Sequence, residues 1–230
     1  MSLMEQERQV LVIFPHPDDE AFGVSGTISL HVKNGTPVTY ACLTLGEMGR
    51  NLGNPPFATR ESLPLIRKNE LQQAAKVMGI DDLRMMGFRD KTIEFENDKA
   101  LTELFSQLID ELNPSLVITF YPGYSVHPDH EATGRAVVRA VRRLPIDKRP
   151  KLHCVAFSNN HMEELGPPDI VNDVREVSEQ KIKAMQAHIS QTAWMLKDME
   201  EKWAKQDPEA LAWLNTERFW TYKWNDDLVK

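Results

Sequence analysis

The sequence predicts an α/β fold, a Rossmann-like three-layer sandwich with a mostly parallel sheet and a helical C-terminal tail. Short continuous apolar runs such as Val10–Phe14 are typical of strands that are buried on both faces, as in a parallel sheet. Segments with the apolar spacing of helices alternate with these runs, which is the pattern of βαβ units. Right-handed crossovers between parallel strands then place helices on both faces of the sheet.

The first half of the chain predicts three strands joined by two helices. In order these are a strand at 10–14, a helix at 19–34, a strand at 38–45, a helix at 61–78 and a short strand at 83–88. Gly35 and Gly79 mark the two helix ends, because glycine is favoured just past a helix C-terminus. The Gly/Pro/Asn-rich segment 46–60 is long for a connection, and such loops in compact domains are often functional.

The second half continues the alternation and ends in the tail. It predicts a helix at 98–112, a strand at 115–122, a helix at 131–144 and a strand at 151–158. From Val177 onward the tail is predicted to be helical, and Asp207-Pro208 resembles a helix start. We expect one domain over residues 7–230, with a core at 10–176 and the tail at 177–230.

Tryptophan residues are concentrated in the tail. It holds all five tryptophans of the chain, which are Trp194, Trp203, Trp213, Trp220 and Trp224. Their simplest role is to pack the tail onto the sheet. The alternative is an oligomer interface or a pocket wall, because aromatic side chains are enriched in such surfaces.

The composition argues against a nucleic-acid or membrane partner. The formal net charge is −7, with 34 acidic and 27 basic residues, and there is no basic stripe. No apolar run approaches the roughly 20 residues that cross a bilayer, and the polar N-terminus lacks the apolar stretch of a signal peptide. Cys42 and Cys154 lie in apolar strand-like runs, which predicts buried free thiols and a cytoplasmic location.

Polar side chains follow two of the predicted strands. His16, Asp18 and Asp19 come directly after the strand at 10–14, and "HPDH" (127–130) comes after the strand at 115–122. Ligands of open α/β sheets bind outside the carboxyl ends of the strands. Either cluster alone has a structural explanation, since Asp19 can cap the helix that follows it. Two clusters at two strand ends predict one shared site.

The residue types in the two clusters suit a metal ion. Histidine and carboxylate without cysteine favour a catalytic zinc or another divalent first-row ion, with three protein ligands and an open position for water. The three ligands come from the six candidates His16, Asp18, Asp19, His127, Asp129 and His130. Adjacent Asp18 and Asp19 do not readily share one role, so one ligates while the other acts as a general base. The chemistry is metal-assisted hydrolysis of a carbonyl or phosphoryl compound.

Two other classes of protein fit the sequence less well. A dinucleotide-binding domain needs G-x-G-x-x-G after its first strand, and this chain has Pro15-His16-Pro17 there. A metal-binding regulatory or storage protein has no use for the groups that remain once three ligands are chosen.

The two motifs resemble a known family. "PHPDDE" after a buried strand, with "HPDH" about a hundred residues later, is similar to the zinc-dependent GlcNAc deacetylases of the LmbE-like or PIG-L family. The resemblance runs from about Val10 to about Gln191 and is greatest to the bacillithiol-pathway deacetylases of Bacillus-type bacteria. It implies removal of acetate from N-acetylglucosaminyl-L-malate, with one Zn²⁺ per chain or another divalent first-row metal. It also implies a homo-oligomer, either a trimer or a hexamer.

The resemblance also implies roles for the motif residues. By that resemblance His16, Asp19 and His130 are the zinc ligands, and Asp18 is the general base.

Five further roles follow from the same resemblance. His127 stabilises the oxyanion and protonates the amine, and Asp129 orients it through a hydrogen bond. Substrate contacts are expected from Arg67, Asp90 and Glu47. A bacillithiol S-conjugate amidase, or a deacetylase of another GlcNAc-containing small molecule, stays as the alternative activity.

Overall fold

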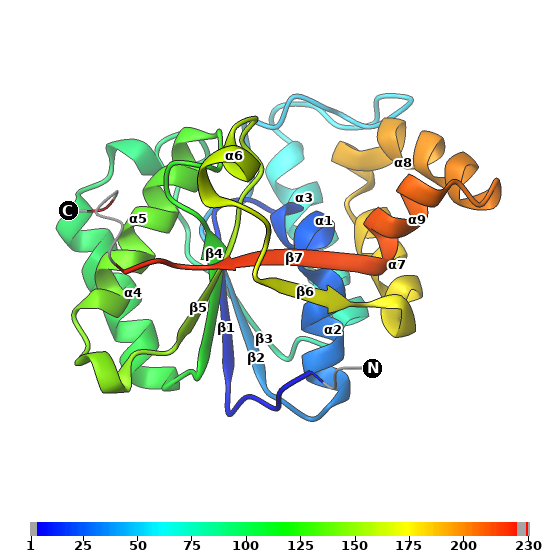
Figure 1. The fold of residues 1–230 in the computed structure, drawn as a ribbon. Helices are drawn as coiled ribbons and strands as arrows, with labels where there is room; N and C mark the ends of the chain where they lie inside the picture. The colour runs from blue at the N-terminus through cyan, green and yellow to red at the C-terminus, as the bar shows by residue number, and fades with distance from the viewer. Residues whose placement is uncertain (1–3, 225–228, 230) are drawn as a thin grey trace.

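The computed structural model describes residues 4–224 and residue 229, and all elements below lie in that part of the chain. Its sheet has the strand order β3-β2-β1-β4-β5-β7-β6 (Figure 1). The strands are β1 (Val10–Phe14), β2 (Val38–Cys42), β3 (Asp82–Met85), β4 (Leu116–Phe120), β5 (Lys151–Val155), β6 (Ile170–Asp173) and β7 (Thr216–Thr221). Strands β1 to β5 are parallel, and β7 is antiparallel to both β5 and β6. The predicted mostly parallel sheet is confirmed.

Helices cover both faces of this sheet. They are α1 (Asp19–Gly23), α2 (Ser25–Lys33), α3 (Leu63–Met78), α4 (Asp98–Leu112), α5 (Pro128–Arg142), α6 (His161–Leu165), α7 (Ser178–Ala187), α8 (Ile189–Ala204) and α9 (Pro208–Asn215). Helices α4 and α5 lie on one face, and α2, α3 and α7 lie on the other (Figure 1). The three-layer sandwich is therefore confirmed.

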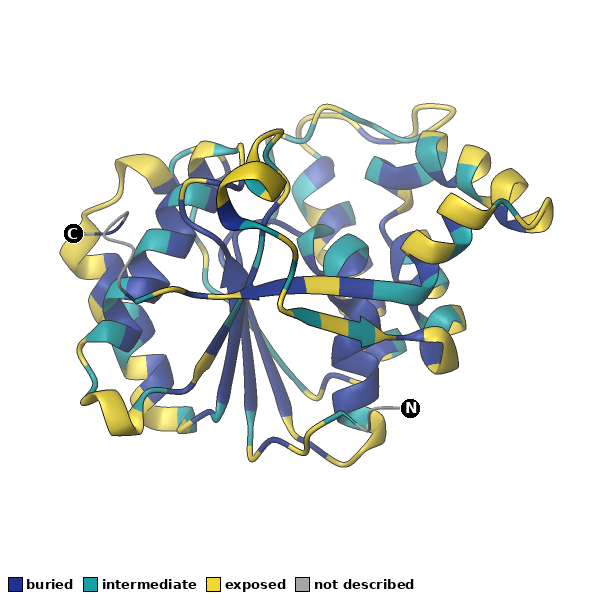
Figure 2. Cartoon of the chain, in the orientation of Figure 1, coloured by how far each residue is buried: buried dark blue, intermediate teal, exposed yellow. Residues whose placement is uncertain are grey.

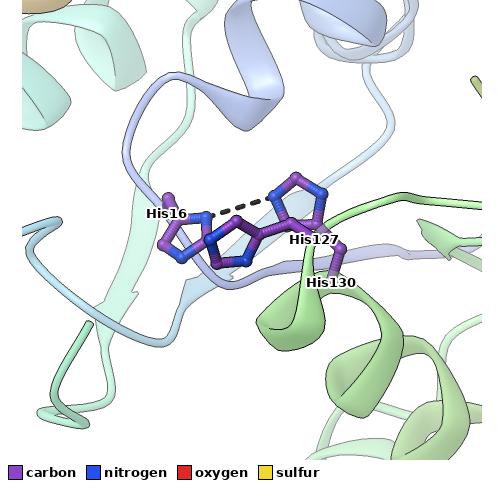
Figure 3. Close-up of side chains that lie close together, drawn as sticks. All are labelled: His16, His127 and His130. Carbon is purple, nitrogen blue, oxygen red and sulfur yellow. Dashed lines mark hydrogen bonds between the residues drawn. The ribbon is translucent and has the colours of Figure 1, made fainter. Parts of the chain in front are cut away.

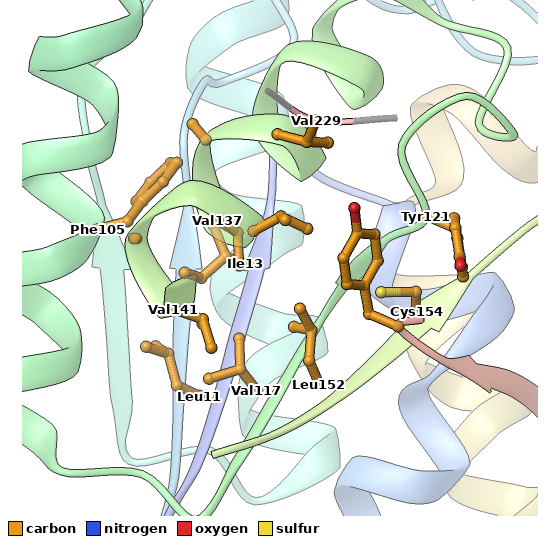
Figure 4. Close-up of a cluster of buried hydrophobic side chains, with 14 of the residues drawn as sticks. Leu11, Ile13, Phe105, Val117, Tyr121, Val137, Val141, Leu152, Cys154 and Val229 are labelled. Carbon is orange, nitrogen blue, oxygen red and sulfur yellow. The ribbon is translucent and has the colours of Figure 1, made fainter. Parts of the chain in front are cut away.

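The sheet separates the hydrophobic core into two halves, and β1 contributes side chains to both. Leu11 and Ile13 pack with α4 and α5, where they meet Phe105 and Val137 (Figure 4). The alternate side chains of β1 pack on the opposite face, against α2, α3 and α7. Every residue of β1 is 0% exposed, and its two neighbours β2 and β4 are also buried at every position (Figure 2). The run Val10–Phe14 is thus apolar at each position because both of its faces are covered.

The predicted helix at 19–34 is two helices. The chain breaks at Val24, whose φ of −142° and ψ of −2° are not helical. The first turn of α2 is held by Glu217, which accepts from the N–H groups of Gly26 (2.9 Å) and Thr27 (2.7 Å). Glu217 belongs to β7 at the far end of the chain, so the cap that starts α2 is not visible in the local sequence.

The tail is largely helical, as predicted, and it also contains a strand. Strand β7 pairs with β5 and with β6, and neither β6 nor β7 was expected from the sequence. The sequence "TERFWT" of β7 holds β-branched and aromatic residues, but its pairing partners are far away in the chain. The tail therefore extends the sheet. The tail was predicted to run to residue 230, but positions 225–228 and 230 lie outside the described residues.

The tryptophans of the tail do not share one role. Trp203 and Trp220 are buried, and Trp220 packs against the sheet from β7. Trp194 on α8 is 60% exposed, so the packing role does not extend to it. Cys42 and Cys154 are free and buried, as predicted. Among the described residues, no helix has both the length and the apolar character to cross a membrane.

Replacing Glu217 by alanine is expected to destabilise the fold by about 3–5 kcal/mol, because the change leaves a buried cation unpaired. Lys181 Nζ lies 3.0 Å from Glu217 Oε1, and both side chains are 1% exposed. The variant also loses the acceptor for the first turn of α2. Urea unfolding of wild type and variant measures the difference.

The matched control for this substitution is Glu179→Ala. Glu179 pairs with Lys183 on the surface of α7, and the two side chains are 76% and 55% exposed. Exposed pairs contribute about 0–1 kcal/mol, so this variant is expected to stay close to wild type. Equal losses in the two variants would contradict the role of the buried pair.

His31 on α2 is expected to make the fold sensitive to acid. The side chain is buried, its Nδ1 has no hydrogen-bond partner among the described residues, and burial lowers the pKa of its imidazole to about 4. The unfolded chain therefore binds the proton first, so stability falls as pH drops from about 6.5 to about 4, by up to about 3 kcal/mol. The free energy of unfolding in urea, measured across this range, should fall steeply with decreasing pH for wild type and less steeply for His31→Leu. Identical slopes would exclude His31 as the source.

Candidate active site

The two polar clusters meet at the carboxyl ends of adjacent strands. His16 follows β1, and His127 and His130 lie at the start of α5, just after β4, which pairs with β1. The ring centroid of His16 lies 4.9 Å from that of His127 and 5.1 Å from that of His130 (Figure 3). The two motifs therefore form one site, at the edge where open α/β sheets bind ligands.

Two histidines and one carboxylate form a small triangle. His16 Nδ1 lies 3.1 Å from His130 Nε2 and 3.4 Å from Asp19 Oδ2. His130 Nε2 lies 3.2 Å from Asp19 Oδ1. Ligands bound tetrahedrally to zinc, with bonds of about 2.0–2.1 Å, lie about 3.3 Å apart. The residues in this triangle thus fit three corners of a zinc tetrahedron.

Hydrogen bonds fix which nitrogen of each ring is free. His16 Nε2 lies 3.2 Å from carboxylate oxygens of both Asp90 and Asp129, which accept its proton. His130 Nδ1 lies 3.1 Å from the Ser125 carbonyl oxygen, which can only accept. The lone pairs of His16 Nδ1 and His130 Nε2 therefore face each other across the dashed line of Figure 3. Such a pair of lone pairs suits a bound cation, and metal-ligating histidines commonly donate their other N–H in this way.

The electrostatic field of the site favours positive charge. Burial opposes the charged form of His16, but hydrogen bonds to Asp129 and Asp19 hold the pKa of its imidazole well above the ordinary value. Burial also opposes ionisation of Asp19, while His130 and then His16 hold the pKa of that carboxyl far below its usual range. A field that favours a second proton on this buried imidazole also favours a divalent cation, whose binding takes the place of the proton on Nδ1.

Besides this triangle, two further groups of side chains in the described part of the chain are close enough to hold a metal. They are His16 with His127 and His130, and His16 with Asp90 and Asp129. The second group would use His16 Nε2, whose proton those carboxylates already accept. Asp90 and Asp129 are therefore better suited to orienting the ring of His16 than to binding the metal themselves.

Asp18 lies beside the triangle and is held by a buried arginine. Arg67, 3% exposed, donates to Asp18 Oδ2 at 2.9 Å, to the Gly46 carbonyl at 2.8 Å and to the Pro17 carbonyl. Burial raises the pKa of the Asp18 carboxyl to about 6, against the attraction of Arg67. The expected contact of Arg67 with substrate stays a prediction, because these three acceptors already engage its guanidinium.

Gly46 explains how that arginine fits under the loop after β2. Its φ is +63°, and a Cβ at this position would lie 1.8 Å from Arg67 Nη1. Only glycine combines this backbone conformation with so close an approach. The loop thus closes over the guanidinium that holds Asp18.

His127 is oriented differently from the expectation. Its Nδ1 accepts from the backbone N–H of Asp129 at 3.2 Å, so the proton of the neutral ring lies on Nε2. Burial and the nearby His16 lower the pKa of His127 and so favour the neutral ring. The Asp129 carboxylate, predicted to hold His127, accepts instead from His16 and from the backbone N–H groups of Lys91 and Ile93. The orienting group is therefore the Asp129 backbone, because the start of α5 turns that carboxylate toward His16.

The two remaining predicted substrate contacts join neighbouring loops. Asp90 is 4% exposed and accepts from the Met48 N–H at 2.8 Å, while its own N–H donates to Glu47 Oε2 at 3.0 Å. Asp90 lines the pocket, whereas Glu47 does not.

A pocket of about 310 Å³ opens over these groups. It is lined by His16, Asp18, Asp19, Met48, Gly49, Arg50, Arg67, Asp90, Lys91, His127, His130 and Gln191. This volume is at the lower end of the range for small-molecule sites.

Comparisons with known proteins show the family of the chain. The family described as PIG-L: GlcNAc-PI de-N-acetylase matches residues 11–141, more than half of the chain. The chain belongs to the PIG-L family.

Two curated relatives match the chain over nearly its whole length. Both are named "Probable N-acetyl-alpha-D-glucosaminyl L-malate deacetylase 2". The Bacillus anthracis protein is 52% identical over 223 residues, which is 97% of this chain and 99% of that protein. The Bacillus cereus protein is 55% identical over 218 residues, which is 95% of this chain and 99% of that protein.

A solved structure shares the fold. It is the N,N'-diacetylchitobiose deacetylase from Pyrococcus horikoshii, with a TM-score of 0.69 and 25% identity. The match covers 93% of this chain and 83% of that one.

This PIG-L chain also holds a buried network that the sequence did not identify. Glu20, the last residue of "PHPDDE", is 0% exposed and lies 2.5 Å from His188 Nε2. Its second oxygen accepts from the Tyr40 hydroxyl at 2.9 Å and from the Asp18 N–H at 3.2 Å. Glu20 thus links the tail to the backbone of Asp18. A glutamate beside two aspartates is not distinguishable from them in the sequence, but its complete burial separates it in the structure.

Proposed function

We propose that this chain is a metal-dependent deacetylase that removes acetate from N-acetylglucosaminyl-L-malate in bacillithiol biosynthesis. One observation carries the proposal. A triangle of ligand atoms with the spacing of a zinc site lies beside a carboxylate, in a family member whose near-full-length relatives are named as deacetylases of this compound.

The proposed cofactor is one Zn²⁺ per chain, held by His16 Nδ1, Asp19 and His130 Nε2. Other divalent first-row metals suit the same ligands. The bound ion supplies Lewis-acid chemistry, because it polarises a carbonyl and lowers the pKa of water to about 7. Asp90 and Asp129 fix the ring of His16 from behind.

Asp18 acts as the general base in this proposal. It takes a proton from the attacking water, whose oxygen bonds to the carbonyl carbon of the acetamide. Arg67 holds the carboxylate in place through Oδ2. Because Arg67 donates to Asp18, its proposed role is to position the base.

His127 stabilises the oxyanion that forms as the water attacks. Its Nε2–H is free to donate, since its Nδ1 is engaged by the Asp129 N–H. The tetrahedral species then breaks at the C–N bond. The proton that Asp18 accepted from the water goes to the nitrogen, because the neutral ring of His127 keeps its Nε2–H, and acetate and a free amine leave.

The test is amine release by metal-loaded protein from three compounds: N-acetylglucosaminyl-L-malate, a bacillithiol S-conjugate and plain GlcNAc. The first compound is expected to be cleaved and the second to be a poor substrate. Cleavage of the S-conjugate alone would overturn the proposal in favour of the amidase. Release from plain GlcNAc at the same rate would favour a deacetylase of another GlcNAc-containing molecule.

Two further parts of the proposal concern the protein in the cell. The homo-oligomer, a trimer or a hexamer, stays a prediction that sedimentation velocity measures. The cytoplasmic location stays a prediction that cell fractionation measures.

A further inference from the structure

Two cations in the pocket have no partner. Arg50 and Lys91 line it and are exposed, and neither side chain has an ion pair or hydrogen bond among the described residues. The third cation of the lining, Arg67, is already bonded to Asp18 and to two carbonyls. Among the described residues that line the pocket, Arg50 and Lys91 are therefore the cationic side chains that are available to a ligand.

The two cations are carried by loops that are bonded to each other. Met48, two residues before Arg50, donates its N–H to Asp90 Oδ2, and the Asp90 N–H donates to Glu47. Lys91 follows Asp90 directly. These reciprocal bonds hold the loops after β2 and β3 together, so both cations lie on the same side of the metal ligands, which come from the ends of β1 and β4.

The backbone around each cation is also fixed. Lys91 has a φ of +62°, and its N–H donates to Asp129 Oδ2 at 2.8 Å, beneath the pocket. Gly49, beside Arg50, lies so close to Gln191 that a Cβ there would be 2.7 Å from Gln191 Oε1. The Gly49 carbonyl accepts from Arg60. Both cations thus extend from anchored positions.

The rest of the lining would repel an acidic ligand. Asp18, Asp19 and Asp90 contribute carboxylates to the same pocket. A substrate with two carboxylates of its own needs opposite charge at the place where they lie. In a glucosaminyl malate the malate is bonded to the sugar carbon next to the one that carries the acetamide. Malate must therefore lie beside the metal ligands when the acetamide reaches them.

From these observations we infer that Arg50 and Lys91 form a subsite for the two carboxylates of the malate, an inference that rests on the proposed function. The guanidinium of Arg50 offers a planar fork that matches a carboxylate, and the ammonium of Lys91 offers a point charge. The subsite selects dianionic aglycones over neutral ones, and it takes no part in breaking the amide bond.

The test compares N-acetylglucosaminyl-L-malate with its dimethyl ester, in which two methyl groups remove the negative charge of the malate. Arg50→Met and Lys91→Met are each expected to raise KM for the diacid roughly 10-fold, the size of one charged hydrogen bond, and to leave the diester unchanged. The double variant should lose the preference for the diacid. Wild-type KM for the diacid should rise with salt, and this slope should flatten in the double variant.

The matched control is Lys68→Met, which removes an exposed cation on α3 that does not line the pocket. It is expected to behave as wild type. Variants of Arg50 and Lys91 that keep the full preference for the diacid, or that weaken both substrates equally, would overturn the subsite while wild-type deacetylation stands. A metal-loaded wild type that cleaves neither compound would overturn the proposed function itself, and the subsite with it.

Discussion

Asp18→Asn is expected to keep the metal and to lose turnover by about 10²- to 10⁴-fold, the range for removal of a general base. The amide has nearly the shape of the carboxylate, so the ligand triangle of His16, Asp19 and His130 is left in place. Asparagine cannot take a proton from the attacking water. Initial rates of amine release from N-acetylglucosaminyl-L-malate, with zinc content measured on the same samples, test this expectation.

The control for this variant is Asp198→Asn, which changes an exposed carboxylate paired with Lys202 on α8. Its rate should match that of wild type. A near wild-type rate in Asp18→Asn would show that the base is another group. A loss of zinc in Asp18→Asn would show instead that Asp18 belongs among the ligands.

His16→Ala is expected to lower the metal content from about one ion per chain toward none, and to abolish activity with it. Alanine removes one corner of the triangle and also the ring that Asp90 and Asp129 hold in place. Metal analysis after dialysis gives the stoichiometry. Chelation of the wild type should give the same loss of activity, and added Zn²⁺ should restore it only in the wild type.

Asp129→Asn separates ligand loss from ligand positioning. The three ligands remain, but His16 loses a carboxylate that orients it, and such changes typically weaken metal affinity by about 10- to 100-fold.

A His16→Ala variant that kept full zinc content would contradict the assignment of His16 as a ligand.

The parts of the fold that local sequence encodes were predictable. Val10–Phe14 is a strand with the predicted bounds, because its apolar run directly reflects burial on both faces. Asp98–Leu112 is a helix with the predicted bounds, and Asn97 caps it through its own side chain. The break at Val24 and the strand β7 were not predictable, since each depends on contacts with residues far away in the chain.

The candidate site was likewise predictable where it depends on local motifs and strand order, and not where it depends on contacts between distant residues. The order of strands brought the motifs of β1 and β4 to one edge, so the set His16, Asp18, Asp19, His127 and His130 could be found from the sequence. The direction of the Asp129 carboxylate could not, because it depends on how α5 begins. Arg50 and Lys91 carried no motif, and only their position on two bonded loops distinguishes them from other surface cations.

Anomalous diffraction at the zinc edge, from crystals of the zinc-loaded protein, tests the central claim most directly. We expect one peak, about 2.0–2.2 Å from His16 Nδ1, His130 Nε2 and an Asp19 oxygen, with the Asp18 carboxylate left unbound. A peak on the other side of the ring, bonded to His16 Nε2, Asp90 and Asp129, would contradict it.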